Sequence, residues 1–192
     1  MEVSNKFDEY NYLVIENAIS TEMADLVKDY FLMKRKVVDQ MRFTKVMSPY
    51  VDYLGKWNDP QAPNTYSHYS DVLMETLLKK LTPLMEKHTG LELYENYSYA
   101  RAYKYGDILY RHTDRFSCEI STTMNLGGDP WAIYLDPTGG QNNEGVEVNL
   151  RPGDMLIYKG NKLEHWRYAF TGNTCVQAFF HYNNKKTEGA EE

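Results

Sequence analysis

The sequence is poor in cysteine, in long apolar runs and in positive charge, and each shortage excludes a class of protein. Two cysteines, Cys118 and Cys175, are too few for a disulfide framework, so we expect a reducing, cytoplasmic setting. No apolar run reaches the roughly 18 residues of a membrane-spanning helix, and the first residues lack the apolar core of a secretory signal. A formal net charge of -6 argues against nucleic acid as a partner, because phosphate binding needs basic residues.

The composition that remains is that of a globular protein. Hydrophobic residues make up 42% of the 192 residues and aromatic residues 14%, with 17 tyrosines. A chain of this length can bury a sizeable core as one domain. We predict one domain over residues 1–182, with a helical amino-terminal part at 1–93 and a β-rich core at 94–182. The polar residues 183–192 are predicted to form a disordered tail.

Two helices are predicted in the amino-terminal part. Ser20 is a suitable N-cap, and the apolar residues that follow it are spaced as on one helical face: Met23, Leu26, Val27, Tyr30 and Phe31. A second helix is predicted to begin near Ser70 and to end at Gly90. Between the two helices, residues 44–66 contain three prolines and are predicted to form a loop.

From about residue 94 the pattern changes to short segments rich in Tyr, Val, Ile and Phe, separated by Gly, Pro and Asn. These segments predict eight strands, near 97–105, 108–113, 117–126, 131–135, 145–150, 154–158, 163–169 and 174–182. Eight short, closely spaced strands favour a mainly β fold with flanking helices, in particular a jelly roll of the cupin type, also called a double-stranded β-helix.

Three residues have the character of metal ligands. His112 and Asp114 lie two residues apart, so on a strand their side chains point to the same side. His165 lies on the seventh predicted strand, which in a jelly roll can return beside the second. Two imidazoles and one carboxylate can hold one face of an octahedral metal ion and leave the other face open, as in the non-haem Fe(II) oxygenases.

The segment around the first two ligands resembles a known family. In Tyr103-Lys-Tyr-Gly106-Asp-Ile-Leu-Tyr-Arg-His112-Thr-Asp114, a tyrosine and then a glycine precede the His-x-Asp motif at the spacing of the 2-oxoglutarate- and Fe(II)-dependent dioxygenases, prolyl 4-hydroxylase-like branch. The segment from Arg151 to Tyr158 also resembles that family. The resemblance implies a double-stranded β-helix, with Fe(II) bound by His112, Asp114 and His165.

The resemblance also implies an activity and its cofactors. The metal would bind 2-oxoglutarate, whose oxidative decarboxylation to succinate and CO2 accompanies hydroxylation of a C–H bond. The substrate would be a peptidyl residue, proline by nearest resemblance, or a free amino acid. The cofactors implied are Fe(II), 2-oxoglutarate as co-substrate, and ascorbate.

One position departs from the family pattern. Relatives place a lysine or arginine about ten residues after the distal histidine, where it binds the C5 carboxylate of 2-oxoglutarate, but this chain has Cys175 there. On physical grounds Arg167 is the best substitute, because it lies two residues after His165 and shares its face on a strand. Weaker candidates are Arg101 and Lys159. Further contacts to 2-oxoglutarate are predicted from the Tyr103 phenol and the Thr174 hydroxyl.

Other interpretations of the same residues stay open. A non-catalytic cupin-type module could keep the metal for binding small molecules, and a Zn(II) hydrolase could use the same ligands, although no separate general base stands out. Arg115 is predicted to pair with Glu119, the alternative being a contact with substrate. The aromatic residues of the 44–66 loop either line the substrate mouth or pack on the barrel; they are Tyr50, Tyr53, Trp57 and Tyr66.

Overall fold

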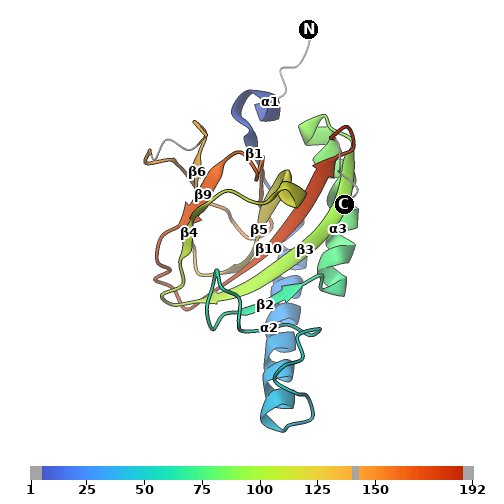
Figure 1. The fold of residues 1–192 in the computed structure, drawn as a ribbon, viewed down its shortest axis with the longest axis vertical. Coiled ribbons are helices and arrows are strands. Elements are labelled where there is room, and N and C mark those ends of the chain that lie inside the picture. The colour runs from blue at the N-terminus through green and yellow to red at the C-terminus, as the bar shows by residue number, and fades with distance from the viewer. Residues whose placement is uncertain (1–5, 140–142, 188–192) are drawn as a thin grey trace.

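The protein is built around two antiparallel sheets that face each other (Figure 1). The computed structural model describes residues 6–139 and 143–187. The larger sheet has the strand order β1-β8-β5-β10-β3-β2 and the smaller sheet the order β4-β9-β6-β7. The elements are α1 (Lys6–Tyr10), β1 (Tyr12–Ile15), α2 (Thr21–Phe43), β2 (Tyr66–Tyr69), α3 (Val72–Thr89), β3 (Leu93–Lys104), β4 (Leu109–His112), the 3-10 helix η1 (Phe116–Cys118), β5 (Ile120–Gly128), β6 (Ile133–Asp136), β7 (Val146–Val148), β8 (Met155–Tyr158), β9 (Glu164–Arg167) and β10 (Thr174–Asn184).

The eight predicted strands are all present, as β3 to β10, and the double-stranded β-helix is confirmed. Two further strands, β1 and β2, lie in the part that was predicted to be helical, and they form the two edges of the larger sheet. Each has only four residues, too few to show a period. The predicted tail begins too early, because Asn183 and Asn184 continue β10 and pair with β3; residues 188–192 lie outside the described part of the chain.

Helices α2 and α3 cover the outer face of the larger sheet (Figure 1). Helix α2 is capped by Ser20, whose side chain accepts a hydrogen bond from the Met23 amide, as predicted. The predicted apolar face is only partly right, because Leu26 is 64% exposed and the buried positions are Ala24, Val27, Phe31 and Val38. Helix α3 begins after Asp71 and ends at Gly90, which adopts the left-handed conformation (φ 72°) that favours glycine.

In the larger sheet the face under the helices is apolar, whereas the face toward the smaller sheet mixes buried polar side chains with apolar ones, such as Leu156, which packs with β6. Along β10, Val176, Ala178 and Phe180 enter the core beneath the helices, whereas Gln177 and His181 are buried on the opposite face, between the two sheets. The main hydrophobic core therefore lies outside the barrel. Buried polar groups are costly unless they are hydrogen-bonded, so the polar interior is the natural place to look for a functional site.

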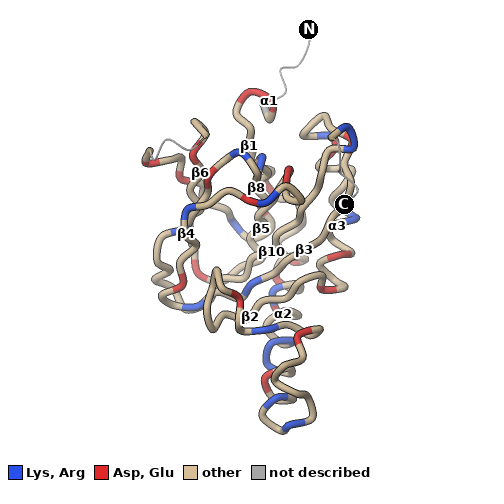
Figure 2. Tube along the Cα trace, in the orientation of Figure 1, with Lys and Arg blue, Asp and Glu red and all other residues tan. Residues whose placement is uncertain are grey.

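Charged residues of both signs are spread along the whole trace, so the net negative charge is not gathered on one face (Figure 2). None of the helices in the described part of the chain combines the length and the apolarity that crossing a membrane requires.

Candidate metal centre

The two histidines of the predicted triad face each other across a strand pair. Strands β4 and β9 run antiparallel, and His112 is the direct partner of His165. Their rings lie 4.3 Å apart between centroids. The return of the seventh predicted strand beside the second is therefore confirmed, and it brings together residues that are 53 positions apart in the sequence.

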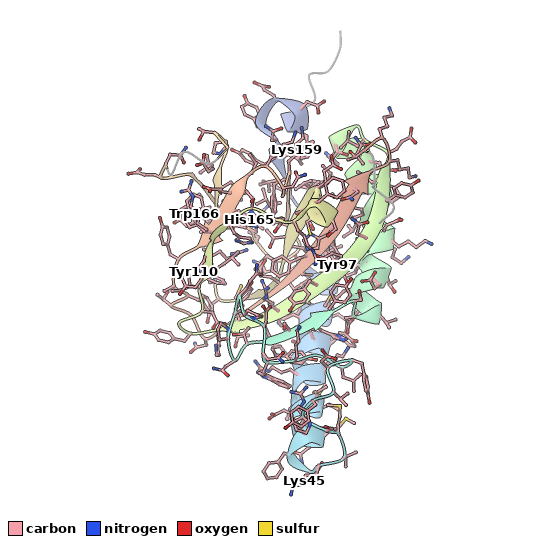
Figure 3. The ribbon with its side chains drawn as sticks, viewed as in Figure 1. Lys45, Tyr97, Tyr110, Lys159, His165 and Trp166 are labelled. Atoms are coloured by element: carbon pink, nitrogen blue, oxygen red, sulfur yellow. The ribbon has the colours of Figure 1, made fainter. Side chains whose placement is uncertain are left out.

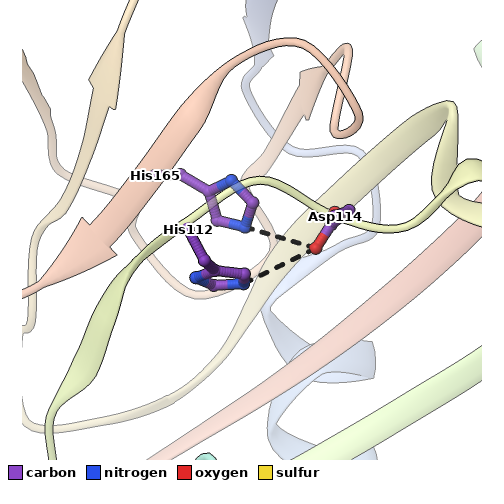
Figure 4. Close-up of side chains that lie close together, drawn as sticks. All are labelled: His112, Asp114 and His165. Carbon is purple, nitrogen blue, oxygen red and sulfur yellow. Dashed lines mark ion pairs between the residues drawn. The ribbon is translucent and has the colours of Figure 1, made fainter. Parts of the chain in front are cut away.

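Asp114 joins the pair from the segment that follows β4. The strand ends at His112, and the Asp114 amide donates to the Gly160 carbonyl (2.8 Å) instead of to a strand partner. Its Oδ1 atom lies 3.6 Å from His112 Nε2 and 3.5 Å from His165 Nε2 (Figure 4). Ligands about 2.1 Å from one metal ion, at right angles, are about 3 Å apart, so the three side chains fit a single ion.

Backbone contacts leave the converging nitrogens free to bind a metal. His112 Nδ1 lies 2.7 Å from the Tyr110 carbonyl, and His165 Nδ1 lies 3.1 Å from the Leu163 carbonyl. A carbonyl oxygen can only accept, so in the neutral imidazole each Nδ1 carries the proton and each Nε2 carries the lone pair. A hydrogen bond at the far nitrogen is also what orients histidine ligands in metal sites.

The carboxylate of the group is ionised. Burial opposes the charge on Asp114, but the interactions with His112 and His165 outweigh it, and the pKa lies well below its usual value. For His112, burial disfavours protonation, yet the contact with Asp114 raises its pKa. Two imidazoles around one anionic oxygen form the donor set of a facial triad, with borderline nitrogen ligands and one hard oxygen ligand.

A second set of possible ligands shares Asp114 and adds Cys118 and His181. Burial raises the pKa of the Cys118 thiol, which keeps it protonated, and only the thiolate is a good ligand. His181 uses its Nδ1 in a 3.0 Å contact with Ser121 Oγ and stacks on Tyr97. The triad is therefore the better metal site among the described residues, and His181 is a packing residue of the cavity wall.

Ser121 and Gly160 contact the Asp114 carboxylate and fix its position; we call these two residues its seat. Ser121 Oγ donates to Asp114 Oδ2 (2.6 Å) and is fully buried. A Cβ at Gly160 would collide with both Asp114 Oδ2 and Ser121 Oγ. These contacts hold Oδ2 and turn Oδ1 toward the histidines. Neither residue had a recognisable signal in the sequence.

We expect Ser121→Ala to weaken Fe(II) binding about tenfold, since loss of a hydrogen bond to a metal ligand costs 10- to 100-fold in affinity. Competition with a chelator would measure this change. Ser98→Ala is a matched control, because Ser98 is equally buried but bonds to Glu75 on the helix side of the sheet. Equal Fe(II) affinity in the two variants would show that Ser121 does not position Asp114.

The triad lines a cavity of about 450 Å³ between the two sheets. The cavity wall also includes residues of β2, β3, β8 and β10 and of the 44–65 segment. Tyr69, Tyr97, Tyr99, Arg101, Tyr158 and Phe179 are among them, together with Asp59, Gln61 and Arg115. The 44–65 segment thus reaches the cavity through Asp59 and Gln61. Its predicted aromatic residues do not line it: Tyr50 is 94% exposed and Trp57 packs on Tyr66.

Arg167 is buried in the barrel without a carboxylate partner. It is 1% exposed, and it donates to the Trp131 carbonyl and, at 3.4 Å each, to Thr123 Oγ1 and Gln177 Oε1. All three acceptors are neutral, its Nε has no partner, and no ion pair found within residues 6–139 and 143–187 includes it. Burial lowers the pKa of the guanidinium. A buried cation without a counter-ion is costly, and binding of an anion would relieve that cost.

The other residues predicted to contact 2-oxoglutarate lie at different depths. Tyr103 is fully buried, and its hydroxyl accepts from Arg101 (3.1 Å). Arg101 lines the cavity, but its charge is neutralised by Asp59 at 2.7 Å. Thr174 shares the β10 face of Val176, which enters the helix-side core, and not the face of Cys175. We therefore leave Thr174 out of the proposal below.

Lys159 is also remote from the cavity. Its ammonium group lies over the Phe7 ring at 5.5 Å, on the α1 side of the barrel and apart from His165 (Figure 3). Neither Arg167 nor Tyr103 lines the cavity. A ligand that contacts them must therefore reach deeper into the barrel than the cavity does.

Comparison with solved structures finds the same fold in oxygenases that bind 2-oxoglutarate. HygX from Streptomyces hygroscopicus, with nickel and 2-oxoglutarate bound, matches with a TM-score of 0.67 at 13% identity, over 97% of this chain and 88% of that one. A viral collagen prolyl hydroxylase from Paramecium Bursaria Chlorella virus-1, in complex with 2-oxoglutarate, matches with a TM-score of 0.61 at 12% identity, over 91% and 97%. A Pseudomonas putida prolyl-4-hydroxylase matches with a TM-score of 0.62 at 11% identity, over 94% and 96%.

No protein-family model matches the sequence, and comparison with curated proteins finds no match. At these identities the likeness concerns the fold. The chain has the double-stranded β-helix of the 2-oxoglutarate–Fe(II) oxygenases, as its resemblance to that family predicts.

Proposed function

We propose that this protein is a 2-oxoglutarate- and Fe(II)-dependent oxygenase that hydroxylates a C–H bond. The observation that carries the proposal is the convergence of His112, Asp114 and His165 at one end of a cavity inside the barrel. A three-ligand site leaves the remaining metal positions for a chelating co-substrate and for O2. A fold shared with enzymes that are complexed with 2-oxoglutarate supports the same conclusion.

Arg167 is the proposed anchor of the C5 carboxylate. Its guanidinium is close enough to Cys175 for each to shift the pKa of the other. Cys175 is the position, ten residues after His165, where the family pattern has its cation. In the family pattern the cation stands ten residues after the distal histidine, a position that lies on β10 in this chain. Here the proposed cation is Arg167, two residues after His165 on β9. Among the described residues this guanidinium has only neutral hydrogen-bond acceptors, so a dianionic ligand would supply the charge that it lacks.

The bound Fe(II) and 2-oxoglutarate would supply the oxidising chemistry, with succinate and CO2 as by-products. The protein's own residues bind, orient and exclude water. His112, Asp114 and His165 hold the ion, while Ser121 fixes the carboxylate. Arg167 orients the co-substrate by charge-assisted hydrogen bonds, and the fully buried Tyr158 ring packs against His165 at 4.7 Å and shields it from solvent.

The proposed substrates are a peptidyl residue, with proline favoured by the resemblance, or a free amino acid. The similar structures include both prolyl hydroxylases and a protein with hygromycin B bound. The same fold thus occurs in proteins with very different ligands, and specificity resides in the cavity wall and loops.

Anaerobic titration of the metal-free protein with Fe(II) and then with 2-oxoglutarate tests the function. We expect a weak visible charge-transfer band that appears only when both are present, because the keto oxygen and the C1 carboxylate must chelate the iron. Succinate is the matched control: it keeps both carboxylates but lacks the keto group, and no band is expected with it. Candidate substrates can then be compared by the succinate that the loaded protein releases in air when each of them is added.

Metal binding without a band for 2-oxoglutarate would contradict the oxygenase proposal. That result would favour the alternative, a cupin-type module that holds a metal and a small molecule without turnover.

A further inference from the structure

Arg115 is a cation at the cavity wall that has no anionic partner. It directly follows Asp114, is exposed and lines the cavity. The predicted pair with Glu119 is not formed: Glu119 instead accepts hydrogen bonds from the Asn184 amide (3.0 Å) and from Thr187 Oγ1 (3.1 Å). The chain leaves the strand after His112, and Arg115 and Glu119 flank the short helix η1. Among the described residues, no carboxylate forms an ion pair with Arg115.

Aromatic rings extend from Arg115 along the cavity wall. The Arg115 guanidinium lies 5.1 Å from the centroid of the Tyr97 ring. Tyr97 stacks on Tyr69 at 4.8 Å and packs at a tilt against His181 at 4.6 Å between ring centroids. Tyr69 is 52% exposed, and Tyr99 meets it edge to face. One exposed and two half-buried tyrosine rings beside a cation make a surface for a flat or apolar body that carries an anionic group.

If the proposed function holds, the charge balance within the cavity also favours a substrate with an anionic group. Arg101 is already neutralised by Asp59. A divalent metal on Asp114, together with Arg167, leaves two positive charges, and these match the two negative charges of 2-oxoglutarate. Among the charged residues of the described cavity lining, the positive charge of Arg115 then remains unbalanced. A neutral internal peptide segment would leave that charge without a partner, whereas a substrate with a free anionic group would neutralise it.

We propose that Arg115 and the ring wall formed by Tyr69, Tyr97 and Tyr99 form the substrate subsite, and that it selects a small substrate bearing an anionic group, a carboxylate above all, next to a flat or apolar body. This inference rests on the proposed function and narrows it: a free carboxylic acid, such as a free amino acid, is favoured over an internal peptidyl residue. Arg115 acts here as a specificity-determining residue.

The test compares phenylacetate with phenylacetamide, which have the same ring and differ in charge. The full chain is loaded with 2-oxoglutarate and with Zn(II), which is redox-inert, and binding is followed by ligand-observed NMR. We expect phenylacetate to bind about tenfold more tightly, the value of one charge-assisted hydrogen bond. In Arg115→Gln we expect phenylacetate and phenylacetamide to bind with about equal affinity. Lys80→Gln, on the exposed face of α3, removes the same charge elsewhere and should leave the preference intact.

A phosphate group could bind Arg115 in the same way, so phenyl phosphate is tested as a second ligand. If phenyl phosphate binds more tightly than phenylacetate, and if this difference is lost in Arg115→Gln, the anionic group of the substrate is a phosphate. Equal affinities for the acid and the amide, no binding of either, or a preference retained in Arg115→Gln would overturn the inference. Failure of the proposed function is seen separately, as absence of the charge-transfer band with Fe(II) and 2-oxoglutarate alone.

Discussion

His112→Ala is expected to abolish succinate formation and to weaken Fe(II) binding by more than about 100-fold, since changes one shell further out already cost 10- to 100-fold. The fold should survive. The His112 side chain is 25% exposed, so its removal opens no buried cavity, and the free energy of unfolding should change by less than about 1 kcal/mol. Fe(II) titration, succinate release and thermal unfolding of the same preparation measure the three effects.

The matched control is His88→Ala. His88 lies in the last turn of α3, on the helix side of the larger sheet, and takes no part in the triad. Its variant should bind Fe(II) and form succinate as the parent protein does. Normal succinate formation by His112→Ala would disprove the assignment of the metal site.

Arg167→Met is expected to change stability and co-substrate affinity in opposite ways. The affinity for 2-oxoglutarate should fall about 10- to 100-fold, because a charge-assisted hydrogen bond in a buried site is worth about 1.5–3 kcal/mol. The stability of the ligand-free protein should stay the same or rise, since an apolar side chain replaces a buried cation that has no carboxylate partner. The charge-transfer titration and thermal unfolding without ligand measure the two quantities.

Arg101→Met provides the contrast. Its removal would leave the buried Asp59 carboxylate without its ion pair, which should destabilise the fold by about 3–5 kcal/mol. A loss of 2-oxoglutarate affinity in Arg101→Met, together with none in Arg167→Met, would move the anchor to Arg101. Destabilisation of the ligand-free protein by Arg167→Met would instead indicate that Arg167 is a structural residue.

Much of the fold could be predicted from local pattern. Strands β3 to β10 were each marked by apolar and aromatic residues between turn residues, and the caps at Ser20 and Gly90 were visible in the sequence. The edge strands β1 and β2 could not be predicted in this way. Four residues show no period, and such short strands form only because an existing sheet offers an edge to pair with. The same limit explains Leu26: helical spacing identifies apolar residues, but packing decides which of them are buried.

In the candidate site, too, local motifs could be predicted from the sequence, whereas contacts between distant residues could not. The convergence of the three candidate metal ligands could be predicted, because His-x-Asp is a local motif with its own chemistry and His165 needed only a strand that returns beside β4. The Arg115–Glu119 pair was predicted wrongly, because closeness in the sequence does not show that the Glu119 carboxylate accepts hydrogen bonds from Asn184 and Thr187, at the far end of the chain. The seat formed by Ser121 and Gly160 has no sequence signal, since serine and glycine acquire this role only from the groups packed around them.

The sequence by itself therefore determined the class of fold, the three candidate metal ligands, and the presence of Cys175 where the family that the chain resembles has a cation. These depend on periodicity and on residue chemistry, which are local properties of the chain. Only the tertiary structure decided how the three arginines are paired within the described residues. Asp59 neutralises Arg101, Arg167 is buried next to Cys175 without an ion pair, and Arg115 lies over Tyr97 without an ion pair. Whether a charge is paired depends on which distant groups the fold places within a few ångströms of it, and no spacing along the chain contains that information.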